Sequence, residues 1–215
     1  ILVGSAIFGG LFTLISVSVR SNAQTTGRVA VDQLARPAMQ RIVDSLHSAC
    51  VYPGLAPIQA GSKGSQISFI SATGSAANPV PILHRIPLSP SPTGALTDIG
   101  YQLTGTAPNW APTSTVVSRF TLLNRASQID GSTPVFRYYK YVNGAISPTP
   151  LPTSGSGLTA ENAKLAVQVT VAFKTSLSQG AQALDDEHAA TLSESVLLRF
   201  SPSNEDTNKA GLPCT

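Results

Sequence analysis

The chain has 215 residues with 14 Lys and Arg against 11 Asp and Glu, a formal net charge of +3, and only 12% charged residues. A net charge this small, with no dense basic block, gives no indication of nucleic-acid binding. A charged share of about half the usual one is typical of secreted surfaces that depend on hydroxyls and prolines. Once an N-terminal helix of about fifty residues is set aside, roughly 160 residues remain, enough for one domain with a core.

Residues 1–19 contain no charged side chain. As a helix with a rise of 1.5 Å per residue they span roughly 28 Å, which is close to the thickness of the bilayer hydrocarbon. A helix that is apolar on every side needs a membrane or other helices around it. We therefore expect residues 1–19 to be a membrane or filament-core segment.

The same helix is predicted to continue to Cys50, because no stop signal precedes Val51-Tyr52-Pro53-Gly54. Apolar residues recur at spacings of three and four, which predicts one buried face in the second half. This face comprises Val31, Leu34, Ala35, Ala38, Ile42, Leu46 and Ala49. Pro37 removes a backbone donor inside the pattern, and because the period continues beyond it we expect a kink rather than an end.

The N-terminal segment contains Ala6-Ile7-Phe8-Gly9 followed by Leu11-Phe12-Thr13-Leu14-Ile15. In these residues it resembles the type IV pilin and pseudopilin superfamily. In this register the family's glutamate falls immediately before Ile1. The chain length and the segment Phe136-Arg137-Tyr138-Tyr139 are most similar to the larger minor pilins and J-type pseudopilins.

The resemblance implies a structural subunit of a filament at the cell surface, held in the cytoplasmic membrane by one span before assembly. Its implied partners are copies of itself or other pilins, membrane lipid and the pilus assembly machinery. The residues expected to pack in the filament are Ala6, Ile7, Gly9, Leu11 and Leu14. In an extracellular protein, Cys50 and Cys214 are expected to form a disulfide. Closing a loop of that length contributes roughly 5 kcal/mol. Two unpaired buried thiols are the alternative.

Residues 51–215 are expected to form an extracellular, β-rich domain with Ser-, Pro- and Gly-rich loops. Strands are predicted at 67–70, 80–86, 99–103, 115–123, 135–142, 164–174 and 191–200, and the prolines of the second place it at a sheet edge. Asn143-Gly144 predicts a hairpin turn. In 164–174 the alternation predicts one buried and one half-exposed face. The predicted fold class is α+β, with the long helix packed on an antiparallel sheet as in pilins.

No catalytic constellation or cofactor motif is present, so we expect no enzyme and no cofactor. The acidic run Asp185-Asp186-Glu187 is read as a solvated loop rather than a metal site. The best candidate for a ligand surface is Arg137, Tyr138 and Lys140 within an aromatic run, although half of that run should be core. Nucleic acid remains possible there but is not indicated.

Three other functions stay open. The chain can be a membrane-anchored extracellular binding module, adhesive or DNA-capturing, that forms no filament. It can be a pseudopilin of a secretion system. A secreted hydrolase on an anchor is the third, and it requires a catalytic cluster that the sequence does not show.

Overall fold

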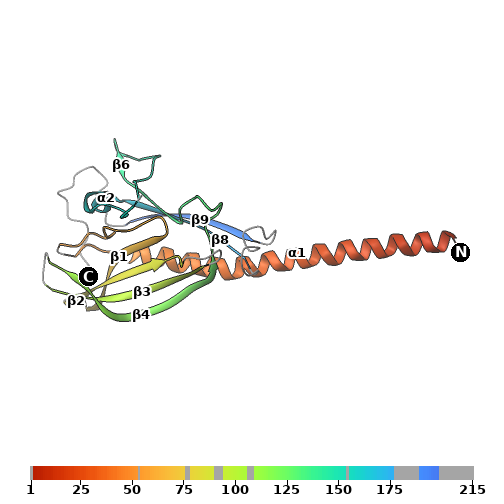
Figure 1. The fold of residues 1–215 in the computed structure, drawn as a ribbon, viewed down its shortest axis with the longest axis horizontal. Helices are drawn as coiled ribbons and strands as arrows, with labels where there is room; N and C mark the ends of the chain where they lie inside the picture. Colours follow the sequence, from red (N-terminus) through yellow and green to blue (C-terminus); the bar gives the residue numbers. More distant parts are fainter. Residues whose placement is uncertain are drawn as a thin grey trace.

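The computed structural model describes residues 2–52, 54–75, 78–89, 94–105, 109–153, 155–176 and 189–198. Side chains of the N-terminal helix are described from Phe12 onward, except at positions 20, 23, 24 and 28. Figure 1 shows one long helix whose C-terminal part runs along a domain built of strands, while its N-terminal part extends away from it.

The helix α1 spans Leu2–His47 and continues through Pro37 without ending there. Its buried residues follow helical spacing: Val31, Ala35, Ala38, Met39, Ile42, Val43 and Leu46. The prediction is wrong at Leu34, which is 56% exposed, and it omitted Met39 and Val43, which are buried. The buried stripe is thus wider and turned slightly from the predicted one, because strands contact α1 from two sides.

Four antiparallel strands form the larger sheet, in the order β1-β2-β3-β4. They are β1 (Gln66–Ser75), β2 (Asn78–Pro87), β3 (Gly94–Thr104) and β4 (Ala111–Ala126). The expectation that the proline-rich strand lies at an edge is wrong, because β2 lies between β1 and β3. β2 pairs with β3 from Ile82 to Arg85, and its prolines Pro79, Pro81 and Pro87 lie outside that range. None of them therefore has to donate a backbone hydrogen bond to β3.

A second sheet has the order β5-β8-β9. Its strands are β5 (Phe136–Tyr139), β8 (Gln168–Thr175) and β9 (Ala190–Leu197), and β8 pairs antiparallel with both neighbours. The strand predicted from residue 164 begins only at Gln168, because a short helix α2 (Ala160–Leu165) with Thr159 as its N-cap precedes it. The predicted half-exposed face of β8 is also wrong, since Thr170 and Ala172 are buried.

The predicted turn at Asn143-Gly144 is confirmed. It joins the two-residue strands β6 (Tyr141–Val142) and β7 (Ala145–Ile146). Asn143 has φ 52° and Gly144 has φ 78°, the left-handed conformation that a type I′ hairpin turn requires at both positions.

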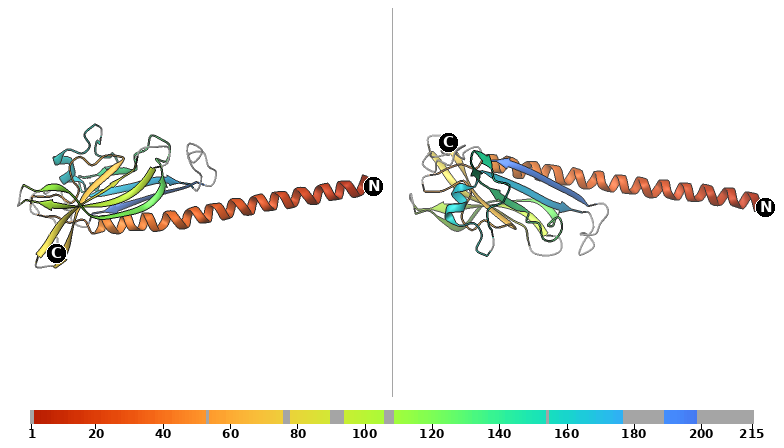
Figure 2. Two further views of the ribbon diagram at one scale, coloured as in Figure 1. Left: turned by 60° about the horizontal axis from the view of Figure 1, so that its bottom comes forward. Right: turned by 90° about the horizontal axis from the view of Figure 1, so that it is seen from above.

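One main core joins the two sheets to α1. Its largest buried side chains include Tyr138, Phe69, Phe136, Phe173, Ile42 and Leu46. A smaller cluster of Cys50, Ile70, Leu83 and Leu103 lies on the other face of the larger sheet. The two further views in Figure 2 show α1 following one side of the strands.

The α+β class, a long helix packed on one antiparallel sheet, is therefore corrected. The described domain is mostly antiparallel β-structure divided among three sheets, and α2 has only six residues. Among the described side chains of α1, the buried ones lie between Val31 and Leu46. The sequence does not show this division into three sheets, because many strands are short and separated by loops. Their pairing therefore depends on contacts between distant residues.

Candidate functional site: the surface of helix α1

The part of α1 outside the domain carries large apolar side chains that no described residue covers. They are Phe12 (72% exposed), Leu14 (73%), Ile15 (53%), Val17 (66%) and Val19 (63%). Isolated exposed apolar residues are ordinary on protein surfaces, but a contiguous group of this kind marks an interaction site. We call residues 12–19 the apolar segment.

Leu14 is the one predicted packing residue whose side chain is described, and it lies in the apolar segment. Ala6, Ile7, Gly9 and Leu11 lie on α1, but their side chains are outside the described residues. Their packing in a filament therefore stays a prediction.

Two exposed apolar residues of α1 lie beyond the apolar segment, beside the domain. Val29 is 50% exposed and Leu34 is 56% exposed, while Val31 and Ala35 next to them are buried. Val29 and Leu34 therefore flank the stripe that packs on the strands. Among the described charged side chains nearby, Arg36 donates through Nε to Asp32 Oδ2 at 2.9 Å.

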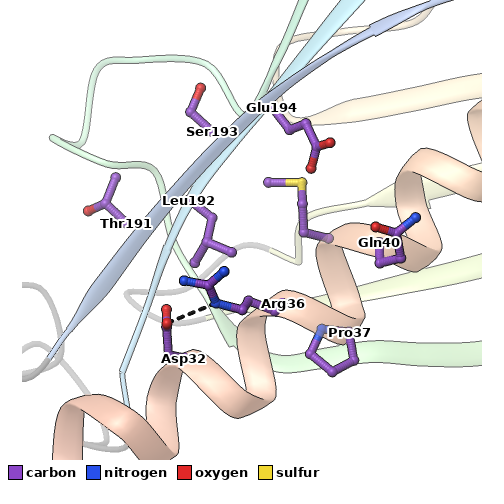
Figure 3. Close-up of a pocket in the computed structure, with 9 residues that line it drawn as sticks. Asp32, Arg36, Pro37, Gln40, Thr191, Leu192, Ser193 and Glu194 are labelled. Carbon is purple, nitrogen blue, oxygen red and sulfur yellow. Dashed lines mark hydrogen bonds and ion pairs between the residues drawn. The ribbon is translucent and has the colours of Figure 1, made fainter.

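A groove of about 570 Å³ runs between α1 and the edge strand β9. Figure 3 shows the helix side of this α1–β9 groove, with the ion pair of Asp32 and Arg36 drawn as a dashed line, and Leu192 and Glu194 extending from the strand toward the helix. Its lining comprises Asp32, Arg36, Pro37, Met39, Gln40, Thr191, Leu192, Ser193 and Glu194. This groove is not predictable from the sequence, since nothing in the local pattern of residues 190–197 shows that they lie beside α1.

The lining of the groove limits its chemistry. It offers carboxylates, a guanidinium, amide and hydroxyl groups beside a buried methionine, and its lining contains no histidine or cysteine.

The predicted ligand surface is not a continuous surface. Tyr138 is fully buried, and its hydroxyl donates to the carbonyl oxygens of Lys63 and Gln66 at 3.1 and 3.3 Å. Burial raises the pKa of Tyr138 well above its ordinary value of 10. Arg137 projects to the opposite face of the strand, and both it and Lys140 are half-buried. Tyr138 is therefore a core residue, and the three side chains do not form one site.

Two cysteines were expected to pair. Cys50 is 5% exposed and disulfide-bonded, and its backbone N–H donates to the carbonyl oxygen of Ile70 at 2.9 Å. Cys214 is the one other cysteine in the sequence, and it lies outside the described residues.

One polar pair on the larger sheet was not predicted from sequence. His84 Nδ1 lies 2.9 Å from Asp98 Oδ1, and both side chains are mostly buried. The ring of His84 stacks on Phe69 at 5.1 Å between centroids. These residues lie on the face of the sheet that packs toward α1, so the carboxylate of Asp98 is engaged within the fold.

The acidic loop at 185–187 lies outside the described residues. Among the residues whose placement is described, no three His, Cys, Asp or Glu side chains come together in a way that suits a metal ion.

Within the described part of the chain, no helix is both long enough and apolar enough to cross a membrane.

No model of a known protein family matches this chain, and no curated protein matches it in sequence.

Proposed function

We propose that this protein is the structural subunit of a helical, type IV pilus-like filament, polymerised through α1. The observation that carries the proposal is the apolar segment, in which five large hydrophobic side chains are exposed on a helix that extends beyond its own domain. Burying this surface against neighbouring helices supplies a hydrophobic driving force of about 25 cal/mol per Å².

The contact between copies is heterologous in this proposal. The apolar segment and the domain are different surfaces of the molecule, and head-to-tail contacts that do not close produce an open helical filament. Before assembly, we expect residues 1–19, which contain no charge, to reside in the cytoplasmic membrane. The filament therefore forms at the cell surface, with lipid, other pilins and the assembly machinery as successive partners.

The test is filament formation by the full chain. Protein purified in detergent is transferred to buffer without detergent and followed by sedimentation and electron microscopy. Wild-type chain should form filaments, and Leu14→Glu should abolish them, because a buried carboxylate without a partner costs several kcal/mol. Val142→Glu is the matched control, since Val142 is exposed on the β6–β7 hairpin and away from α1.

Circular dichroism of both variants shows whether the domain is folded, which we expect because both side chains are exposed. Wild-type protein that stays monomeric, or Leu14→Glu protein that still forms filaments, would contradict the proposal. A monomeric wild-type protein would favour the membrane-anchored binding module.

A further inference from the structure

Acidic residues are scarce in the segment of the chain that contains the larger sheet. Residues 45–129, which contain the whole larger sheet, hold four of the 14 Lys and Arg residues and one of the 11 acidic residues, Asp98. The rest of the chain holds ten of each, so it is neutral and the whole net charge of +3 belongs to residues 45–129. Cations that have few acidic neighbours in the same part of the fold favour a partner of the opposite charge.

Two of the four cations lie on one face of the larger sheet. Arg85 of β2 pairs with Ile99 of β3, and Ile99 pairs with Arg119 of β4. Directly opposed residues project from the same face of an antiparallel sheet. With strands about 4.8 Å apart, the Cα atoms of Arg85 and Arg119 are about 10 Å apart, within reach of a common polymer.

This face points away from α1. His84, the residue before Arg85, stacks on the core residue Phe69, and Phe120, the residue after Arg119, lies 3.5 Å from the guanidinium carbon of Arg41 on α1. Since side chains alternate along a strand, Arg85 and Arg119 project to the outer side. Thr97 and Thr121, a directly opposed pair, lie two residues along on the same face. We call Arg85, Arg119, Tyr101, Thr97 and Thr121 the outer arginine face.

The arginines of this face have hydrogen-bonding capacity to spare. Neither Arg85 nor Arg119 forms an ion pair with a described residue. The guanidinium of Arg85 lies 5.3 Å from the ring of Tyr101. The carboxylate of Asp98 does not compete, because it is on the inner side and holds His84 at 2.9 Å.

We propose that the outer arginine face binds an acidic polysaccharide through the carboxylates of successive sugars. The planar guanidinium of arginine matches a carboxylate with two parallel hydrogen bonds, and the threonine hydroxyls suit sugar hydroxyls. This binding site is independent of the filament proposal, because it lies on the domain and uses no residue of α1.

The aromatic residues of this region argue against single-stranded nucleic acid as the partner. Base stacking needs open aromatic faces. Tyr101 is half-buried and lies against Arg85, and Trp110 packs edge-on against Tyr52 at 5.3 Å between centroids. The face therefore offers cations and hydroxyls and lacks a stacking platform among its described residues.

The experiment measures binding of fluorescently labelled polygalacturonate to the full chain in detergent by anisotropy at low salt. Arg119→Gln and Arg85→Gln should each weaken binding about tenfold, and the double variant should lose it. Lys164→Gln is the matched control, because it removes one exposed positive charge from α2 on the other part of the domain and should leave binding unchanged. Affinity should fall as salt rises, since ion pairing at an exposed face is screened.

Arg119 is exposed, so its replacement leaves the fold intact and keeps the test valid even if Arg85→Gln reduces stability. Unchanged binding by Arg119→Gln, or equal binding of the methyl-esterified polymer, would overturn the proposal. Tighter binding of a single-stranded oligonucleotide that displaces polygalacturonate would overturn it in favour of nucleic acid. Filament formation is measured in a separate experiment, because binding and loss of binding are each compatible with assembly and with its absence.

Discussion

At the scale of single residues, Tyr138 shows how an aromatic residue in a charged run can belong to the core. Its ring is fully buried, and its hydroxyl satisfies the carbonyl oxygens of Lys63 and Gln66 at 3.1 and 3.3 Å. These two carbonyls belong to the turn that leads into β1. The hydroxyl therefore links β5, in the second sheet, to the start of β1, in the larger sheet.

We predict that Tyr138→Phe lowers the free energy of unfolding by about 0.5–1.5 kcal/mol, because it removes the hydrogen bonds that the Tyr138 hydroxyl donates to the carbonyl oxygens of Lys63 and Gln66. Tyr139→Phe, on the opposite face of the same strand, should change it by less than about 0.5 kcal/mol. Chemical denaturation of the two variants measures both values. Equal effects in the two variants would show that the hydroxyl of Tyr138 contributes nothing specific.

The same residue predicts a dependence on alkaline pH. The pKa of Tyr138 is raised in the folded protein by burial, so above pH 10 the unfolded chain loses its tyrosine proton while the folded chain keeps it. The stability that the buried, protonated Tyr138 contributes below pH 10 is therefore lost as the pH rises above 10. Wild-type protein should lose more stability between pH 9 and pH 11 than Tyr138→Phe, measured by thermal unfolding, and parallel profiles would contradict this assignment.

At the scale of elements, α1 has two kinds of leucine. Leu46 is fully buried between the sheets, whereas Leu34 is 56% exposed at the side of the same helix. Leu46→Ala should cost about 2–5 kcal/mol, because it removes buried surface and leaves a cavity. Leu34→Ala should cost less than about 1 kcal/mol in the monomer, and the two measurements by denaturant unfolding in detergent serve as controls for each other. A large loss with Leu34→Ala would mean that its exposed side is covered within the monomer.

The elements also show how far sequence patterns reach. Local signals predicted the Asn143-Gly144 turn and the positions of most strands, because turn chemistry and alternation act over a few residues. They failed where distant contacts decide the outcome. Residues 160–165 form a helix that begins after the Thr159 cap, and both faces of β8 are buried although its alternation predicted one half-exposed face.

For the functional surface, the sequence indicated an apolar segment and its general position, but it did not show which side chains lie uncovered. Leu34 was expected in the core, and the α1–β9 groove and the arginine pair of β2 and β4 were not foreseen. The arginine pair depends on register between strands that are far apart in the chain, as in the row of Arg85, Ile99 and Arg119. The exposure of Leu34 and the α1–β9 groove depend on how α1 packs on distant strands. Hydrophobic periodicity contains no information on such registers.

At the scale of the whole molecule, its shape restricts how copies associate. Packed helices lie 8–10 Å apart, whereas the domain is far broader than its helix. Two parallel copies with their apolar segments side by side would bring their domains into collision. In the proposed filament the copies must therefore shift along the helix axis, and the apolar segment of one copy then meets a later part of α1 in the next.

The exposed apolar residues of α1 suggest how large this shift is. Beyond the apolar segment, the large hydrophobic side chains of α1 that are described as exposed are Val29 and Leu34. The centres of the two groups are about 16 residues apart, which corresponds to a shift of about 24 Å. Arg36, which lies near this position, already forms an ion pair with Asp32. An uncharged helix can therefore pack there without burying an unpaired charge.

We predict that a mixture of Ile15→Cys and Leu34→Cys chains forms a disulfide-linked heterodimer within assembled filaments, because the shift brings these positions together. A mixture of Ile15→Cys and Asp44→Cys chains should give much less, since position 44 lies about 15 Å further along the helix. Native Cys50 is already disulfide-bonded and does not compete. Oxidation of filaments followed by non-reducing electrophoresis measures both yields, and electron microscopy confirms that each mixture has assembled. Filaments in which Ile15→Cys chains link mainly to one another would show that the helices pack without the shift, with the domains splayed apart instead.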